Sequence, residues 1–280
     1  MTYDPRDDAF KSYEAAIDAL RAKHLKAKKV VRIGDCELIL GDCLEVMPQL
    51  GSASHVITDP PYEACMQALH ASSKLRRTDG GPQRQVLNFQ SIVNLRDPLV
   101  DLVAGQCEGW FLAFCNVEGV GEWRTSILRA KMKFKTSCAW VKPDATPKLN
   151  GQGPALSYEC FTTAWAGRGH ARWNAGGKRG VYTHNTNNRE RTGKHPTEKP
   201  ASLMREILTD FTNAGETILD PFMGSGPPLV ACAKLGRKGI GIELDPDYFE
   251  IACKRVDEAY RQPDLFVSVP SKPVQVGFDI

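Results

Sequence analysis

The stretch "TILDPFMGSGPPLVACAKLGRKGIGIELD", Thr217–Asp245, decides the fold class, because it holds a complete strand–turn–helix–strand unit. The apolar run Thr217–Leu219 predicts a buried strand, and the apolar spacing of Leu229–Leu235 predicts a helix. Lys238–Ile242 predicts a second strand, which closes on acidic residues. A strand that returns through a glycine turn and a helix to another strand is typical of a parallel sheet covered by helices.

The glycine turn of this unit indicates a nucleoside site. Gly224 and Gly226 allow the backbone to approach a ligand closely, and Glu243 follows about twenty residues later, where a carboxylate can bind ribose hydroxyls. A dinucleotide-binding turn needs a third glycine, but Pro227 and Pro228 follow here and remove backbone donors that a diphosphate requires. The pattern therefore favours a nucleoside without phosphates over a dehydrogenase cofactor. The alternative is a glycine turn used only for tight packing.

A second unusual turn lies upstream in "HVITDPPYEAC", His55–Cys65. The predicted strand His55–Thr58 stops at Asp59, and two prolines and Tyr62 follow. Each proline fixes its φ angle, and the first also keeps Asp59 out of helical space. A turn without a special role would more often use Gly or Asn. The stiff turn therefore predicts that a carboxylate and an aromatic ring are held in fixed positions.

The rest of the chain continues the alternation of strands and helices, which predicts an α/β fold with a doubly wound, mostly parallel sheet. The helix before Val30 is predicted from apolar residues three or four apart. They are Phe10, Tyr13, Ile17, Leu20 and His24. The further predicted strands and helices are Cys36–Leu40, Trp110–Asn116, Glu118–Met132 (helical), Ser137–Val141, Tyr158–Trp165 and Ala201–Phe211 (helical).

The composition excludes several classes of protein. The chain has 280 residues with an ordinary share of hydrophobic and charged residues, which suits one large α/β domain with an insertion. Nine cysteines without a C-x-x-C pair argue against a disulfide framework and a zinc ribbon, so we expect reduced thiols and no metal site. The polar start Met1–Phe10 and the lack of a long apolar run predict a cytoplasmic protein that does not enter a membrane.

Four motifs together resemble one enzyme family. They are "DPPY" at Asp59–Tyr62, "HPTEKP" at His195–Pro200, "DPFMGSG" at Asp220–Gly226 and "GIELDPDYFEIACKRV" at Gly241–Val256. These segments, in this order, are similar to bacterial and phage DNA amino-methyltransferases of the permuted (β) group, which act on adenine N6 or cytosine N4 and serve in restriction–modification. The resemblance implies S-adenosylmethionine as cofactor and double-stranded DNA as partner. It also implies a circularly permuted, Rossmann-like sheet with an inserted target-recognition segment.

The permutation implies a numbering of four strands of one sheet. If Thr217–Leu219 is counted first and Lys238–Ile242 second, Cys36–Leu40 becomes the third strand and His55–Thr58 the fourth. All four carboxyl ends then lie along one edge, where open α/β sheets bind ligands.

The resemblance also implies roles for individual residues. Asp59, Pro60 and Tyr62 are expected to be catalytic, because a carboxylate and a carbonyl can accept the two N–H groups of the target amine while an aromatic ring stacks on the base. Asp42 is expected to bind the adenine amino group of the cofactor, Glu243 its ribose, and Lys199 its methionine carboxylate. The full set of predicted cofactor residues is Asp42, Cys43, Asp59, His195, Thr197, Lys199, Asp220, Phe222, Gly224, Ser225, Gly226, Glu243 and Leu244. Glu159, in "LSYECF", lies where the family often has an acid near the target pocket.

The target amine lies inside a duplex, so the nucleotide must leave the base stack and the DNA must be held. Two basic, turn-rich segments, Ser72–Gln90 and Gly167–Lys194, are the candidates for this contact. Their predicted DNA-binding residues are Arg76, Arg77, Arg84, Arg168, Arg172, Lys178, Arg179, Arg189 and Arg191. Charged runs of this kind are also common as solvated loops without a ligand.

These predictions divide the chain into an N-terminal helix (1–29), a catalytic half (30–166), a target-recognition segment (167–194), a cofactor-binding half (195–262) and a tail (263–280). The recognition segment is short, which suggests a short target sequence, a homodimer or a loosely specific enzyme.

Two positions depart from the family pattern. Pro227 replaces the usual Thr, which brings the affinity for the cofactor into question, and Glu63 stands where Asn is common. The resemblance implies that Asp59 favours adenine N6, because the members that act on cytosine N4 more often have Ser at this position. The alternatives are cytosine N4, an RNA substrate, a protein glutamine, which the motif order disfavours, and an inactive DNA-binding protein.

Overall fold

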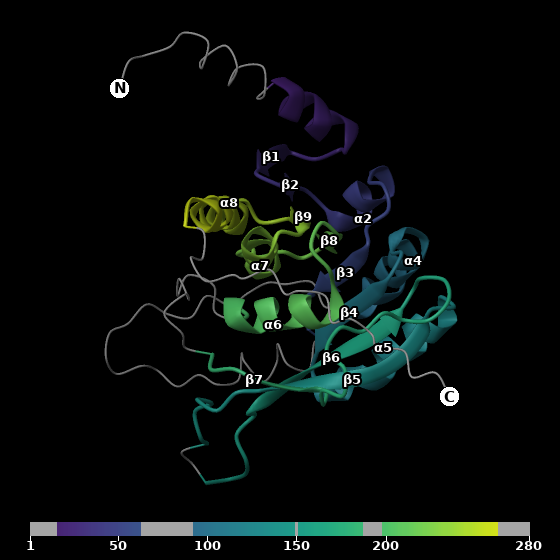
Figure 1. Cartoon of the computed structure of the whole chain (residues 1–280), viewed down its shortest axis with the longest axis vertical. Helices are drawn as coiled ribbons and strands as arrows, with labels where there is room; N and C mark the ends of the chain where they lie inside the picture. The colour runs from purple at the N-terminus through teal and green to yellow at the C-terminus, as the bar shows by residue number, and fades with distance from the viewer. Residues whose placement is uncertain (1–15, 63–91, 149–150, 187–197, 263–280) are drawn as a thin grey trace, which may run out of the picture.

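A computed structural model describes residues 16–62, 92–148, 151–186 and 198–262, which form a three-layer α/β structure around one sheet (Figure 1). The sheet has nine strands in the order β1-β2-β9-β8-β3-β4-β6-β5-β7. The strands are β1 (Lys29–Ile33), β2 (Cys36–Leu40), β3 (His55–Thr58), β4 (Trp110–Cys115), β5 (Lys133–Val141), β6 (Tyr158–Trp165), β7 (Val181–Thr183), β8 (Thr217–Asp220) and β9 (Lys238–Glu243).

The five central strands, β2, β9, β8, β3 and β4, are parallel to one another. All residues of β3 and β4 are buried, as expected for parallel strands covered on both faces. The four strands counted third, second, first and fourth lie side by side as β2-β9-β8-β3 and are parallel, so their carboxyl ends share one edge, as predicted. That this order arose by circular permutation stays a prediction.

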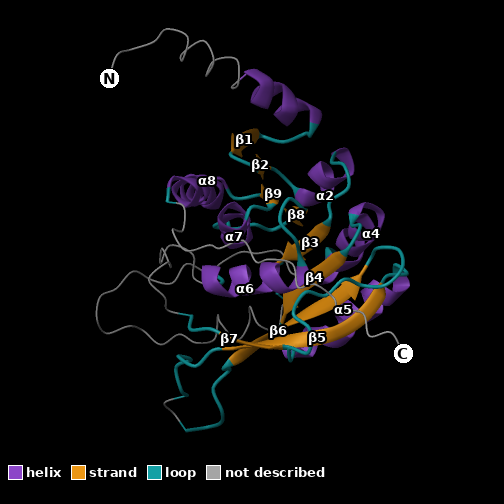
Figure 2. Cartoon of the chain, viewed as in Figure 1, coloured by secondary structure: helices purple, strands orange, loops and turns teal. Residues whose placement is uncertain are grey.

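Helices cover both faces of the sheet (Figure 2). They are α2 (Cys43–Val46), α4 (Arg96–Gln106), α5 (Val120–Arg129), α6 (Ala201–Phe211), α7 (Pro227–Leu235) and α8 (Pro246–Arg261), with short 3-10 turns at Met47–Gln49, Ile92–Asn94 and Val117–Gly119. One apolar cluster joins α2, α4 and α5 to one face, and a second joins α6, α7 and α8 to the other. The sheet is therefore doubly wound, as predicted.

The helices next to the glycine turn begin at clear sequence signals. Gly226, with φ of +81°, precedes α7, whose first two residues are Pro227 and Pro228. The Asp245 side chain accepts hydrogen bonds from the backbone N–H groups of Asp247 and Tyr248 and so caps α8. These caps fix the directions in which α7 and α8 leave the carboxyl-end edge of the sheet.

Two predictions about the edges of the fold were wrong. The amphipathic spacing placed Leu20 on the packed face of the first helix, but Leu20 is 69% exposed, while Ala22 and Leu25 are buried. The strand predicted at Ser137–Val141 begins at Lys133, because its first half is a partly exposed strand paired only with β6.

Within the described ranges, no helix combines the length and the apolar character needed to cross a membrane.

Candidate active site

The carboxyl ends of the central parallel strands bring together the acidic residues predicted from separate motifs. Asp42 follows β2, Glu243 ends β9, Asp220 ends β8 and Asp59 follows β3. The register pairs Leu40 with Glu243, so the turns after β2 and β9 leave the sheet side by side. This edge is where open α/β sheets bind ligands.

The glycine turn is held against the end of β9 by hydrogen bonds to its backbone. The Gly224 N–H donates to Glu243 Oε2 at 2.8 Å, and the Asp245 N–H donates to Oε1 at 2.8 Å. Burial raises the pKa of Glu243. The two carboxylate oxygens together offer about four acceptor positions, so Glu243 can accept these backbone N–H groups and a hydroxyl group as well.

The predicted cofactor residues lie at different depths at this edge. Leu244, beside Glu243, is 60% exposed. Asp42 is also exposed, and its side chain accepts the Leu44 N–H at 2.8 Å to cap α2. Cys43 and Ser225 are buried. His195 and Thr197 lie outside the described residues.

Asp220 lies beneath the site. It is 1% exposed and accepts hydrogen bonds from Thr58 Oγ1 at 2.7 Å and from the Phe222 N–H at 3.0 Å. Burial raises its pKa to about 7, although both hydrogen bonds favour the charged form. Asp220 therefore ties the end of β8 to the residue before Asp59, and its predicted contact with the cofactor stays a prediction.

The Lys199 side chain reaches the Asp59–Tyr62 turn from the segment before α6. Its ammonium is 2.6 Å from Asp59 Oδ2, 3.1 Å from Tyr62 Oη and 3.1 Å from Glu159 Oε2, and its side chain is 3% exposed. An ammonium has three N–H donors, and these three oxygens match them. The predicted contact of Lys199 with the methionine carboxylate stays a prediction, and it would replace one of these three contacts.

Glu159 completes the cluster, a role that sequence reasoning had left open. Tyr62 Oη donates to Glu159 Oε2 at 2.6 Å, and Lys142 forms an ion pair with the other carboxylate oxygen. Burial alone would raise the pKa of Glu159, but the charges of Lys199 and Lys142 outweigh it and lower that pKa to about 2. Burial would lower the pKa of Lys199, and the carboxylates of Asp59 and Glu159 raise it instead.

The catalytic cluster, which we define as Asp59, Tyr62, Lys142, Glu159 and Lys199, carries two positive and two negative charges. Burial raises the pKa of Asp59, and the Lys199 ammonium opposes this shift. Asp59 Oδ1 is buried and has no hydrogen-bond partner among the described residues. A buried acceptor without a partner costs free energy, so this oxygen is prepared to accept a donor from a ligand.

Aromatic rings form the wall around the ammonium of Lys199. Its Nζ lies 5.2 Å from the ring centroid of Tyr62, 5.1 Å from that of Phe114 and 5.9 Å from that of Trp140. Ring faces attract cations at these distances and also stack on flat bases.

Two predicted DNA-binding residues are used for internal contacts. Arg172 pairs with Glu216 at 3.0 Å, and Glu216 also contacts His55, the first residue of β3. Asp59 follows the other end of β3, about 13 Å away at the usual rise of a strand. Lys178 contacts Glu206 at 2.6 Å and also Asp210, both on α6.

Lys178 therefore holds this part of the predicted recognition segment against α6, whereas the Arg172 side chain is still 60% exposed, and the DNA contact of both residues stays a prediction. Arg168 and Arg179 are exposed. The remaining predicted DNA-binding residues lie outside the described part of the chain, and they are Arg76, Arg77, Arg84, Arg189 and Arg191.

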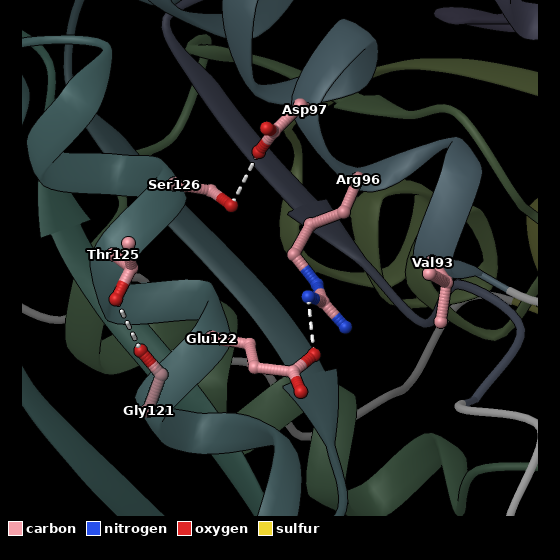
Figure 3. A pocket seen from close by; sticks show the side chains of 7 residues that line it. All are labelled: Val93, Arg96, Asp97, Gly121, Glu122, Thr125 and Ser126. Carbon is pink, nitrogen blue, oxygen red and sulfur yellow. Dashed lines mark hydrogen bonds and ion pairs between the residues drawn. The ribbon is translucent and has the colours of Figure 1, made fainter.

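A separate pocket of about 300 Å³ lies between the first turns of α4 and α5 (Figure 3). Its charged groups are paired, since Arg96 contacts Glu122 at 2.5 Å and Ser126 donates to Asp97 at 2.6 Å. None of the predicted site residues lines it. Among the residues that the structure describes, no three His, Cys, Asp or Glu side chains are grouped so that they could hold a metal ion.

Comparison with known proteins agrees with this arrangement. A family model described as DNA methylase, of the N6/N4 type, matches residues 53–254, so the chain belongs to this family. M.HinfI, a type II methyltransferase of Haemophilus influenzae, is 24% identical over 272 residues, which cover 85% of this chain and 74% of that protein. M2.DpnII, a type II methyltransferase of Streptococcus pneumoniae, is 48% identical over 65 residues.

The match to M2.DpnII covers 23% of this chain and only 24% of the relative. The solved structure of an M1.HpyAVI–SAM complex has the same fold, with a TM-score of 0.62 and 24% sequence identity over 79% of this chain and 99% of that chain.

Proposed function

We propose that the chain transfers a methyl group from S-adenosylmethionine to the N6 amine of an adenine that has left the base stack of duplex DNA. The observation that carries the proposal is Asp59, whose Oδ2 is bound by Lys199 while its buried Oδ1 has no partner among the described residues. Tyr62 follows within the same stiff turn. A fixed acceptor beside an aromatic ring suits an exocyclic amine on a flat base.

The residues at the carboxyl ends of the parallel strands, around Glu243 and the glycine turn, suit a nucleoside with a methionine tail. The lone pairs of Glu243 suit ribose hydroxyls, and exposed Leu244 beside it suits the face of a purine. Pro227 and Pro228 occupy the first positions of α7 and offer no backbone donors to a diphosphate. When bound, S-adenosylmethionine would supply a methyl group on a positively charged sulfur, and attack of an amine at the methyl carbon would break the S–CH3 bond with a neutral thioether as the leaving group.

The protein's part in the reaction is to prepare the amine. The amine lone pair is delocalised into the base ring, so the amine is a weak nucleophile. Asp59 Oδ1 accepts one N–H and the Pro60 carbonyl accepts the other, which favours a tetrahedral nitrogen with its lone pair aimed at the methyl carbon. As the N–C bond forms, positive charge develops on the nitrogen, and Asp59 stabilises it and can take the released proton. Stacking on Tyr62 contributes about 1–3 kcal/mol to holding the base.

The neutral balance of the catalytic cluster supports this role. Lys199 and Lys142 offset Asp59 and Glu159, so that the site keeps Asp59 as an acceptor without presenting a net charge to the base. The same geometry suits the N4 amine of cytosine. The choice of adenine rests on Asp59, the first residue of the DPPY motif.

The test is transfer of a labelled methyl group from S-adenosylmethionine to unmethylated duplex DNA, followed by digestion to nucleosides and their separation. Label in N6-methyladenine is the expected result. Label in N4-methylcytosine would keep the mechanism and replace the base. A parallel reaction with RNA of the same sequence tests the alternative substrate, and label only there would overturn the proposal.

A further inference from the structure

Arg255, on α8, connects two segments of the site that are far apart in the sequence. Its side chain is 8% exposed, and Nη1 donates to the Ser225 carbonyl at 2.9 Å and to Ser225 Oγ at 2.8 Å. Its Nη2 lies 2.7 Å from Glu198 Oε1, and the Glu198 side chain is 2% exposed. Ser225 belongs to the glycine turn, and Glu198 directly precedes Lys199. None of the predicted site roles included Glu198 or Arg255.

Glu198 and Lys199 lie outside any helix or strand and have different partners. A residue before proline is kept out of helical space, and Lys199 precedes Pro200. Neighbouring side chains on extended backbone lie on opposite sides. Glu198 therefore reaches Arg255, while Lys199 reaches Asp59.

The same face of α8 also sets the position of the glycine turn. A Cβ on Gly226 would lie 3.1 Å from the Cβ of Ala252, which is three residues before Arg255 on the helix. Ala252 thus limits how closely the turn approaches α8, and Arg255 binds the carbonyl and hydroxyl oxygens of Ser225. With Pro227 next in the chain, the turn lacks the usual hydroxyl and N–H at that position, and the arginine supplies a fixed anchor.

We propose that Arg255 is a positioning residue that couples the glycine turn to the catalytic carboxylate through Glu198 and Lys199. The inference rests on the proposed function and adds a physical link between cofactor binding and the position of Asp59. A shift of the turn is transmitted through Arg255 and Glu198 to the backbone that carries Lys199, and so to Asp59 Oδ2.

The test separates positioning from simple stability. In Arg255→Met, Glu198 loses its buried partner, so this variant is expected to lose stability. In the double variant E198M/R255M the ion pair is replaced by apolar side chains, which is often neutral for stability. The matched control is Arg237→Met, since Arg237 also donates to backbone oxygens, those of Thr212 and Leu235, at the other end of α7.

For each variant the unfolding temperature, the dissociation constant for S-adenosylmethionine by calorimetry, and kcat on duplex DNA as a function of pH are measured. We expect E198M/R255M to unfold near the wild-type temperature, yet to bind the cofactor about 10-fold more weakly, as loss of a charged hydrogen bond predicts. Its kcat should fall about 100-fold, as for a misplaced catalytic group. The acidic limb of its profile of kcat against pH should also shift relative to that of the wild type. Arg237→Met should leave the dissociation constant and the pH profile unchanged.

The inference is overturned if the double variant regains wild-type affinity and kcat together with its stability, because the pair then serves only the fold. It is also overturned if Arg237→Met produces the same weakening. If the wild-type protein transfers no methyl group to DNA, the proposed function fails, but the dissociation constants of the three variants still decide whether Arg255 positions the glycine turn.

Discussion

Replacing Lys199 with Met removes the cation that three oxygens of the catalytic cluster share. Asp59 Oδ2 loses the ammonium at 2.6 Å, and the charge of the cluster changes from neutral to negative. Breaking a buried ion pair by removing one partner costs about 3–5 kcal/mol, and the 3% exposure of Lys199 leaves little water to compensate. We therefore expect the free energy of unfolding, measured in urea, to fall by about this amount.

The same change should shift the pH dependence of methyl transfer. Burial raises the pKa of Asp59 and Lys199 opposes it, so without Lys199 the pKa rises further. A cation this close to a carboxylate favours its charged form, so its removal raises the pKa of that carboxylate. Transfer needs Asp59 deprotonated, so the acidic limb of the kcat profile should move to higher pH in Lys199→Met.

The assay is single-turnover methyl transfer with saturating cofactor, between pH 5 and pH 9. Lys142→Met is the comparison, because Lys142 pairs with Glu159 in the same cluster and no described contact joins it to Asp59. The acidic limb of the kcat profile should move less in Lys142→Met than in Lys199→Met. A Lys199→Met variant that keeps the wild-type limb but binds S-adenosylmethionine much more weakly would refute this reasoning and restore the methionine carboxylate as the partner of Lys199.

Three further predictions follow from single positions. Asp59→Ala should lower methyl transfer by about 100- to 1,000-fold, as for a lost transition-state contact, and change cofactor affinity little, as calorimetry would show. Asp220 has a folded-state pKa of about 7, above the ordinary value for Asp, so the stability that its protonated form contributes is present at low pH and is lost as the pH rises through 7. The free energy of unfolding of Asp220→Asn, measured in urea, should therefore rise by roughly 4 kcal/mol relative to that of the wild type between pH 4 and pH 8. Gly226→Ala forces a side chain onto a φ of +81° beside Ala252 and should cost about 1–2 kcal/mol of stability.

Each of these three predictions has a clear contrary result. Near-normal turnover by Asp59→Ala would remove Asp59 from the reaction. An unchanged pH dependence of stability in Asp220→Asn would mean that Asp220 is ionised in the folded protein. A Gly226→Ala variant as stable as the wild type would mean that the turn can adopt another conformation.

Local sequence signals were sufficient for most of the central sheet. β3 and β6 were predicted with the bounds that the structure has, as was α6, because continuous apolar runs and helical spacing are properties of a few neighbouring residues. The two site turns were equally local, since glycines, prolines and a carboxylate at strand ends are visible in the chain itself. β1 and β7 were not predicted, because these short, half-exposed strands depend on a partner strand for their hydrogen bonds.

The sequence by itself determined the fold class, the four central strands that share one edge, and the acidic residues that gather at that edge. Only the tertiary structure decided which side chains meet there. Lys199 contacts Asp59 and Glu159 across long separations in the chain, and Arg172 lies at the far end of β3 from the site to which its charge had assigned it. The physical reason is that an ammonium or a guanidinium binds whichever carboxylate the packing of distant strands and helices brings within reach, and no local pattern records that distance.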